Sequence, residues 1–164
     1  MNRIVTAVAA AAYGFALVHA TPASAQTEDR MIPAEAVAVD SREHGCLTEA
    51  IYREAGAEPM RGRMAVAQVI VNRTRSGTFP SSVCGVVHQR GQFSYPKGLG
   101  PKRGPGEAKL WSEAESIASL ALRGMLAKVS SRALYFTSAA ARAPFGPRIR
   151  LVEVIGRHAF YAPR

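Results

Sequence analysis

The first regular pattern of apolar and polar positions lies a third of the way along the chain. The positions that share one face of a helix, at i, i+3, i+4, i+7 and i+8, hold Leu47, Ala50, Ile51, Glu54 and Ala55. A helix in this segment therefore carries a carboxylate within an apolar stripe. We expect Asp40 or Ser41 to cap the start of this helix and Gly56 to end it. Glu49 and Arg53 lie on the other side of the helix, where i,i+4 partners of opposite sign belong.

Three further segments show helical patterns. A set of residues after Pro59 is apolar nearly all round: Met60, Met64, Ala65, Val66, Ala67, Val69, Ile70 and Val71. This predicts a helix buried at the centre of the domain, with proline at its first position. Its polar exit is formed by Asn72, Arg73 and Arg75, and Gly77 ends it. A turn and cap ending at Ser82 should precede a short helix over 83–87. Residues 107–125 show one continuous apolar face, which predicts a long structural helix in which Trp111 is a core anchor.

The rest of the chain predicts strands and loops. Ala133–Thr137 and His158–Tyr161 are short and rich in aromatic residues, as strands often are. The run YPKGLGPKRGPG, residues 95–106, cannot form regular structure and should be an exposed loop, and SAAARAPFGPRIR, residues 138–150, also reads as a loop. The predicted fold class is α+β, mainly α: a single domain with a small antiparallel sheet.

The N-terminus has the three parts of a secretory signal peptide. Arg3 provides a charged start, residues 4–18 are apolar, and Ala23-Ser24-Ala25 offers a cleavage site. An uncleaved anchor is the alternative, although the apolar run is shorter than the roughly 20 residues of a membrane span. We therefore assign residues 1–25 to a signal peptide, 26–44 to a mobile leader and 45–164 to the folded domain, located in the periplasm or secreted.

The chain is strongly basic, with a formal net charge of +9. Removal of Arg3 with the signal peptide leaves a charge of about +8, which favours association with anionic polymers of the cell envelope. Nucleic acid is the usual alternative partner for such a charge. Export and the lack of a nucleic-acid-binding motif argue against it.

Cys46 and Cys84 are the only cysteines. In an exported protein of this size an even pair predicts one disulfide, which would close a loop of about 39 residues and stabilise the fold by about 3 to 4 kcal/mol. Two free thiols or a metal site are the alternatives. A metal site would need further ligands, and none with suitable spacing is visible.

Glu54 has the features of a catalytic acid. It lies on an apolar stripe and in the last turn of its helix, so partial burial and the negative end of the helix dipole should both raise its pKa. A raised pKa is what a general acid near neutral pH requires. The alternative is a solvated glutamate placed on this face by chance.

An ordered series of short motifs resembles the SleB/CwlJ family of cell-wall hydrolases. The motifs, spread over roughly residues 45–161, are IYREAGAEP, GRMAVAQVIVNR, FPSSVCGVVHQ, QFS, LWSEAESIASLAL and IGRHAFY. The resemblance implies a lysozyme-like fold and a glycosidase that cuts the β-1,4 bond between N-acetylmuramic acid and N-acetylglucosamine in peptidoglycan. The first glutamate of the EAxxE pattern, Glu54, would be its acid.

The sequence departs from the family at two places. Many relatives have a cysteine shortly after QFS, where this chain has Pro96 and Lys97. Relatives commonly have a histidine at the position of Thr137 and a tryptophan in the loop that follows, and residues 138–150 contain neither. The local geometry of these loops, and with it the activity, is where this chain should differ from its relatives.

Several residues are candidates for binding the glycan. They are Glu58, Gln92, Phe93, Ser94, Tyr135 and His158. Gln92 and Ser94 could hydrogen-bond sugar substituents, and Phe93 or Tyr95 could stack on a sugar face. Glu58 is either the cap of the second helix or a second catalytic carboxylate.

The number of carboxylates decides the glycosidase mechanism. Hydrolysis normally uses two carboxylates. With one carboxylate, the substrate's own 6-hydroxyl attacks, as in a lytic transglycosylase, and gives a 1,6-anhydro product.

A zinc-dependent N-acetylmuramoyl-L-alanine amidase would need about three ligands, and His44, His88 and His158 lack metal-ligand spacing. A basic envelope-binding protein without catalysis is the remaining alternative. We expect a monomer that acts on peptidoglycan strands without a metal or cofactor and without stable membrane insertion.

Overall fold

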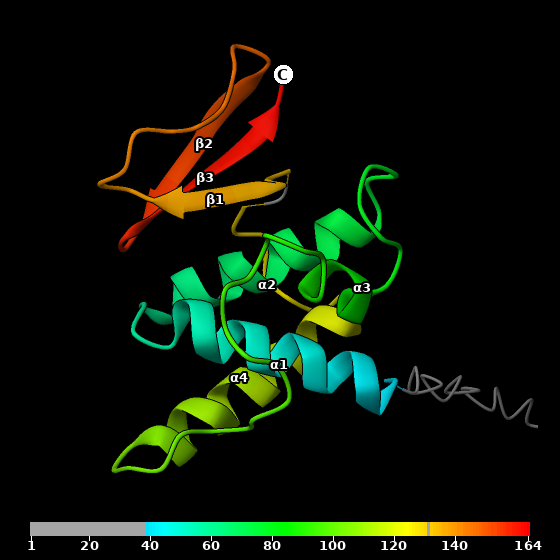
Figure 1. Cartoon of the computed structure of the whole chain (residues 1–164), viewed down its shortest axis with the longest axis vertical. Helices are drawn as coiled ribbons and strands as arrows, with labels where there is room; N and C mark the ends of the chain where they lie inside the picture. Colours follow the sequence, from blue (N-terminus) through cyan, green and yellow to red (C-terminus); the bar gives the residue numbers. More distant parts are fainter. Residues whose placement is uncertain (1–38, 131) are drawn as a thin grey trace, which may run out of the picture. The chain divides into compact units, whose positions relative to one another are not determined.

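The computed structural model describes residues 39–130 and 132–164, in which four helices precede a three-stranded antiparallel sheet (Figure 1). The elements are α1 (Ser41–Ala55), α2 (Met60–Thr74), α3 (Val83–Val87), α4 (Glu107–Leu122), β1 (Tyr135–Ser138), β2 (Ile149–Ile155) and β3 (His158–Pro163). The predicted fold class, α+β and mainly α, is confirmed. The predicted signal peptide and most of the leader lie outside the described residues.

Helix α1 begins where a side chain caps it. The Asp40 carboxylate accepts hydrogen bonds from the main-chain amides of Arg42 and Glu43, at 2.7 and 3.3 Å, as predicted. The boundary placed between leader and domain at residue 45 was wrong, because the first turn of α1 packs on α4. There the His44 imidazole lies 2.9 Å from the hydroxyl of Ser119.

Gly56 ends α1, but in a right-handed conformation with φ of −56°. Its main-chain amide donates to the carbonyl of Tyr52 at 3.1 Å. A Cβ at this position would meet that carbonyl oxygen at 2.5 Å. Glycine is therefore required here because the carbonyl of Tyr52 comes too close for a side chain. The ability of glycine to adopt a positive φ plays no part.

Helix α2 is the centre of the core, as its nearly uniform apolarity predicted. In Figure 1 it runs between the sheet and the pair formed by α1 and α4. Five of its residues have no exposed surface: Ala65, Val66, Ala67, Val69 and Ile70. Pro59 is the residue before the first turn, and no side chain caps the helix. The interpretation of Glu58 as the cap of α2 was therefore wrong.

The predicted disulfide joins Cys46 on α1 to Cys84 on α3, with the two Cα atoms 5.3 Å apart. The same two helices are joined a second time, because the Glu43 carboxylate accepts hydrogen bonds from the amides of Val83 and Cys84. A carboxylate at a helix N-terminus satisfies amides that have no partner within the helix. Together these contacts fix α3 against the start of α1.

The sheet has the strand order β1-β3-β2, with Tyr135 opposite Tyr161 and Ser138 opposite His158. Strand β2 was missed, because its first residues were assigned to the loop over 138–150. It is an edge strand in which only Ile155 is buried, so its sequence lacks the apolar alternation that marks a half-buried strand. Its position comes from pairing with β3 and from an ion pair between Glu153 and Arg61 of α2.

The loop over 95–106 is irregular, as predicted, but it is attached to α1. The Glu49 carboxylate accepts hydrogen bonds from the amides of Gly98 and Leu99, at 2.7 and 3.2 Å, and Arg53 donates to the carbonyl of Gly100 at 2.7 Å. Arg53 also pairs with Glu49 at 3.8 Å, as expected. Glu49 is only 5% exposed, because the loop covers it.

Helix α4 ends at Leu122, three residues earlier than the predicted limit of 125. Met125 lies beyond it and is 68% exposed. Trp111 packs edge-on against Tyr52, with ring centroids 5.3 Å apart, and its indole N–H donates to Glu115 at 3.0 Å. Its expected structural role is supported by these contacts.

Candidate active site

Glu54 lies in the last turn of α1 and lines a cavity of about 550 Å³ between the helices and the sheet. Arg73 from α2, Gln92 from the loop after α3, Tyr135 from β1 and His158 from β3 line the same cavity. Segments far apart in the sequence therefore meet around one carboxylic acid.

Glu54 also lines a second hollow, of about 280 Å³. It is lined by Arg53, Lys102, Glu107 and Arg157 among others. Glu54 thus borders two adjoining hollows.

The Glu54 carboxylate makes no hydrogen bond or ion pair with any residue that the structure describes. Burial raises the pKa of Glu54 above its ordinary value, and the nearby Lys97 opposes this effect only in part. The direction agrees with the prediction from the apolar stripe. Glu54 is therefore an acid that holds its proton to higher pH than a solvated glutamate and has its carboxyl group free for a ligand.

Lys97 stands where many relatives are expected to have a cysteine, and sequence reasoning gave it no role. Its ammonium donates to the carbonyls of Phe93 and Tyr95, at 3.1 and 2.9 Å, and lies 3.5 Å from the centroid of the Tyr95 ring. These contacts fold the loop after α3 back upon itself. Lys97 thereby places a positive charge near both Glu54 and Glu49.

The Tyr95 hydroxyl is buried beside these acids and has no hydrogen-bond partner within the described part of the chain. Burial, together with the charges of Glu54 and Glu49, raises the pKa of Tyr95 far above its ordinary value. The hydroxyl is therefore protonated at neutral pH.

Three predicted binding residues, Gln92, Tyr135 and His158, line the cavity with Glu54. Phe93 does not. It is 8% exposed and belongs to the hydrophobic core, so the expected stacking of its ring on a sugar is not possible without unpacking. Ser94 is exposed and does not line the cavity.

Glu58 is turned away from this cavity and serves the sheet. Its two carboxylate oxygens accept hydrogen bonds from the main-chain amide and the Nε of Arg157, both at 2.9 Å. Burial alone raises the pKa of Glu58, but the hydrogen bonds from Arg157 outweigh it and hold the pKa below its ordinary value. Gly156 allows this contact, because a Cβ there would meet the Glu58 carboxylate at 2.1 Å.

The sequence reasoning missed Arg73, Thr137 as a lining residue, and Phe145. Arg73 follows Asn72 at the end of α2 and was read only as part of the polar exit of that helix. One signal in the sequence could have identified Arg73: it is a charged residue that continues the apolar positions of a buried helix. Thr137, at whose position the family resemblance leads us to expect a histidine, lines the cavity.

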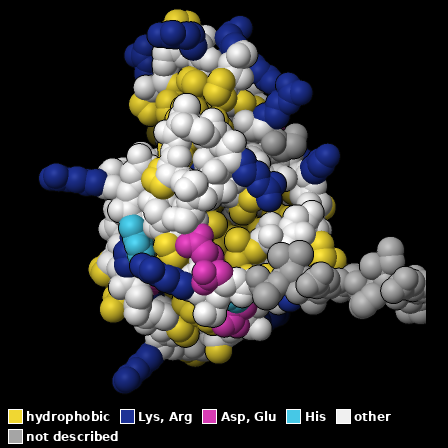
Figure 2. All heavy atoms as spheres, turned by 90° about the vertical axis from the view of Figure 1, so that its right-hand side faces the viewer, with side chains coloured by type: hydrophobic (Ala, Val, Ile, Leu, Met, Phe, Trp, Pro, Cys, Tyr) yellow, Lys and Arg dark blue, Asp and Glu magenta, His cyan; other side chains and the backbone are white. Residues whose placement is uncertain are grey.

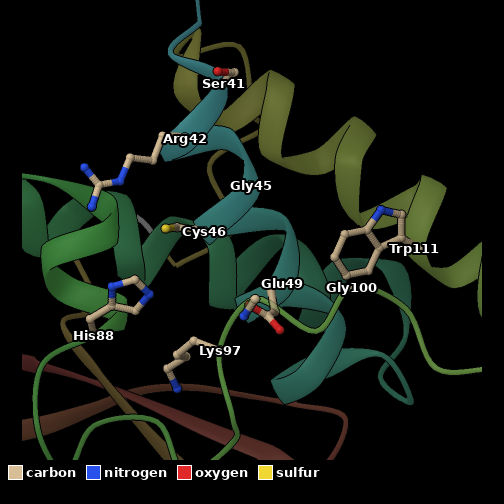
Figure 3. A pocket seen from close by; sticks show the side chains of 10 residues that line it. Ser41, Arg42, Gly45, Cys46, Glu49, His88, Lys97, Gly100 and Trp111 are labelled. Atoms are coloured by element: carbon tan, nitrogen blue, oxygen red, sulfur yellow. The ribbon is translucent and has the colours of Figure 1, made fainter.

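Another hollow, of about 470 Å³, lies beside α1 and is shown in Figure 3. Arg42, His88 and Lys97 surround it on one side and Trp111 on the other, with Glu49 between them. Its one carboxylate already binds the amides of Gly98 and Leu99. It therefore offers no free acid, and the cavity at Glu54 is the candidate active site.

The three histidines of the described chain lie apart. His44 contacts α4, His88 borders the hollow of Figure 3, and His158 lines the Glu54 cavity. Within residues 39–130 and 132–164, no three His, Cys, Asp or Glu side chains gather as metal ligands would. The same residues contain no helix with the length and apolarity needed to span a bilayer.

The fold and the site together define the class of protein: a mainly helical domain with a small sheet, in which one free carboxylic acid, Glu54, lines a cavity between the helices and the sheet. The family model described as Cell Wall Hydrolase matches residues 57–161, and the chain belongs to this family. The match begins three residues after Glu54.

The curated relatives are much longer than the matched regions. The chain is 38% identical over 69 residues to the spore cortex-lytic enzyme of Bacillus subtilis, covering 42% of this chain and 23% of that protein. It is 49% identical over 43 residues to the spore cortex-lytic enzyme of Halalkalibacterium halodurans, covering 26% of this chain and 13% of that protein. The matches thus span less than a quarter of these relatives.

Two solved structures share the fold. The catalytic domain of the Bacillus cereus SleB protein aligns with a TM-score of 0.58 and 24% identity, over 76% of this chain and 92% of that one. The catalytic domain of the germination-specific lytic transglycosylase SleB from Bacillus anthracis aligns with a TM-score of 0.55 and 24% identity, over 76% and 97%. At this identity the likeness establishes the fold.

Proposed function

We propose that this protein is a peptidoglycan-cleaving glycosidase that cuts the β-1,4 bond between N-acetylmuramic acid and N-acetylglucosamine, with Glu54 as its general acid. The observation that carries the proposal is the free carboxyl group of Glu54, its pKa raised by burial, at the junction of two hollows. Membership of the cell-wall hydrolase family supports the substrate class.

The reaction begins with proton transfer. Glu54 gives its proton to the oxygen that bridges the two sugars, and the bond between this oxygen and C1 of the muramic acid breaks. Glu54, now a carboxylate, takes the proton of the muramic acid 6-hydroxyl as that oxygen attacks C1. The products are a 1,6-anhydro sugar and a free 4-hydroxyl, and Glu54 is protonated again.

The distribution of carboxylates favours this route over hydrolysis. A hydrolase needs a second carboxylate about 5 to 5.5 Å away for retention, or about 6.5 to 9.5 Å away for inversion. Glu58 is occupied by Arg157 and does not line the cavity. Glu107 lines the second hollow, but it accepts a hydrogen bond from the hydroxyl of Tyr52.

The surface charge supports a substrate in the cell envelope. Lys and Arg side chains reach the surface at both the sheet end and the helical end of the face shown in Figure 2, in keeping with the net charge of +9. Such a field speeds association with anionic polymers. We propose that the protein is exported by its signal peptide, acts as a monomer in the periplasm or outside the cell, and needs no metal or cofactor.

Mass spectrometry of the products tests this proposal. Purified protein lacking residues 1–25 is incubated with peptidoglycan sacculi, and the released muropeptides are analysed. We expect disaccharide peptides that end in 1,6-anhydro-muramic acid. Reducing muramic acid ends would indicate hydrolysis, and free stem peptides with EDTA sensitivity would indicate an amidase. A protein that binds sacculi without releasing any fragment would be a binding protein, and the proposal would be wrong.

A further inference from the structure

Arg73 places a cation in the wall of the Glu54 cavity. The residue is 4% exposed, although it lines the cavity. Its Nε donates to the carbonyl of Leu134 at 2.7 Å, and its guanidinium carbon lies 4.8 Å from the centroid of the Phe79 ring and 5.9 Å from that of Phe93. One hydrogen bond to the main chain and two aromatic rings therefore fix the plane of the guanidinium group.

This cation has no counter-ion among the described residues. Each of the four ion pairs found there uses a different arginine: Arg53, Arg61, Arg63 and Arg157. The two terminal nitrogens of Arg73 meet no hydrogen-bond acceptor in the described part of the chain. Burial lowers the pKa of Arg73 to about 10, so the group is still charged at neutral pH. A buried charge without a partner is costly.

Glu54 is the single acidic residue that lines the same cavity, and it does not pair with Arg73. As the general acid of the proposed reaction it enters the cycle protonated and uncharged. It cannot then supply the negative charge that Arg73 lacks. A ligand in the cavity can supply it, because a guanidinium group with two free terminal nitrogens matches the two oxygens of a carboxylate.

Aromatic rings continue from Arg73 along the cavity wall. Phe79 lies 5.9 Å from Tyr135, and Tyr135 lies 5.2 Å from Phe145, between ring centroids, and all three residues line the cavity. Rings of this kind accept the apolar face of a sugar. Phe79, at one end of this row, also lies against the guanidinium group of Arg73.

We propose that Arg73 is a specificity-determining residue that binds a carboxylate carried by the glycan in the Glu54 cavity. The inference rests on the proposed function and names its substrate class more closely. Two carboxylates of peptidoglycan fit: the lactyl carboxylate of muramic acid in strands without peptide, and a carboxylate of the stem peptide. Glycans of N-acetylglucosamine alone carry neither and should bind weakly.

Binding measured without turnover tests the inference. Calorimetric titrations use the Glu54→Gln protein and four probes: peptide-free muramic acid glycan tetrasaccharide, the same glycan with its lactyl carboxylates converted to amides, the peptide-bearing tetrasaccharide, and chitotetraose. We expect a carboxylate-bearing probe to bind about 10- to 100-fold more tightly than its neutral counterpart. The peptide-free pair and the peptide-bearing probe distinguish the lactyl from the stem-peptide carboxylate.

Variants then assign the effect to Arg73. In the same background, Arg73→Gln should bring the ratio between charged and neutral probes close to one, whereas Arg73→Lys should keep part of it. Arg75→Gln is the matched control, because Arg75 is exposed and does not line the cavity. The ratio is taken within one protein preparation, so a loss of folded protein does not change it.

Two results would overturn the inference. One is equal binding of charged and neutral probes by the protein that retains Arg73. The other is an equal fall of the ratio in Arg73→Gln and Arg75→Gln, which would assign the effect to overall charge. Failure of the proposed function gives a different result: wild-type protein would discriminate between the probes and still release no muropeptide.

Discussion

Arg157 binds the Glu58 carboxylate through both its main-chain amide and its Nε, each at 2.9 Å. Glu54, four residues earlier in the sequence, makes no such contact with the described residues. The pKa of Glu58 is lowered and that of Glu54 is raised. The surroundings of these two carboxylates therefore drive their pKa values apart. The raised pKa suits Glu54 as an acid, and the lowered pKa suits Glu58 as a structural anion.

Glu54→Gln should lower muropeptide release by at least about 100-fold, because the amide keeps the shape of the side chain and loses the transferable proton. Binding to sacculi should remain. Glu153→Gln is the control, since Glu153 pairs with Arg61 on the outer strand β2 and should leave the rate unchanged. If Glu54→Gln released muropeptides at the wild-type rate, the assignment of Glu54 as the catalytic acid would be wrong.

Glu58→Gln should lower the free energy of unfolding by about 1 to 3 kcal/mol while leaving most activity per folded molecule, because one of two hydrogen bonds from Arg157 loses its acceptor. Urea unfolding measures the first effect and product analysis the second. A two-carboxylate hydrolase in which Glu58 takes part would instead lose its activity.

The effect of Glu58→Gln on stability should depend on pH. Since the pKa of Glu58 is lowered on folding, its contribution to stability is present above the unfolded pKa of about 4.3 and is lost as pH falls through the folded value. The stability difference between wild type and Glu58→Gln should therefore shrink below about pH 4. A difference that stays constant below this pH would contradict this account of the pair.

Lys97→Met should move the alkaline limb of the profile of kcat/KM against pH to higher pH. Glu54 acts in its protonated form, so activity falls as pH rises through its pKa, and removing the nearby positive charge of Lys97 raises that pKa further. Lys128→Met, at an exposed position away from the cavity, should leave the limb in place. A shift to lower pH would show that Lys97 acts on Glu54 in another way.

Removal of the disulfide should lower the free energy of unfolding by about 3 to 4 kcal/mol on the chain-entropy model. The double substitution Cys46→Ala and Cys84→Ala, and the reduced wild-type protein, should unfold at similar lower urea concentrations. Intact mass after alkylation checks the bond in the exported protein. Two alkylated thiols without prior reduction would show that it does not form there.

Cleavage of the signal peptide should follow Ala25, because small residues occupy the positions that signal peptidase reads. N-terminal sequencing of protein from the periplasm or medium should begin at Gln26. A sequence that begins at Met1 in the membrane fraction would mean that the N-terminal segment is an anchor.

Local patterns were enough to predict much of the helical part. The apolar stripe of α1, the nearly uniform apolarity of α2 and the capping side chains of Asp40 and Ser82 act within a few residues of one another, so they can be read directly from the sequence. The pairing of Cys46 with Cys84 followed from the cysteine count and the predicted export. The place of Glu54 on the apolar stripe also predicted the direction of its pKa shift.

Contacts between distant segments decided what the sequence could not show. Glu49 is buried because a loop 49 residues later donates amides to it, and Glu58 is a structural anion because Arg157 lies 99 residues away in the sequence. Strand β2 exists by pairing with β3 and has little apolar pattern of its own. Arg73 becomes part of the cavity only when α2 lies under β1. Burial and charge balance depend on such neighbours, which only the tertiary structure brings together.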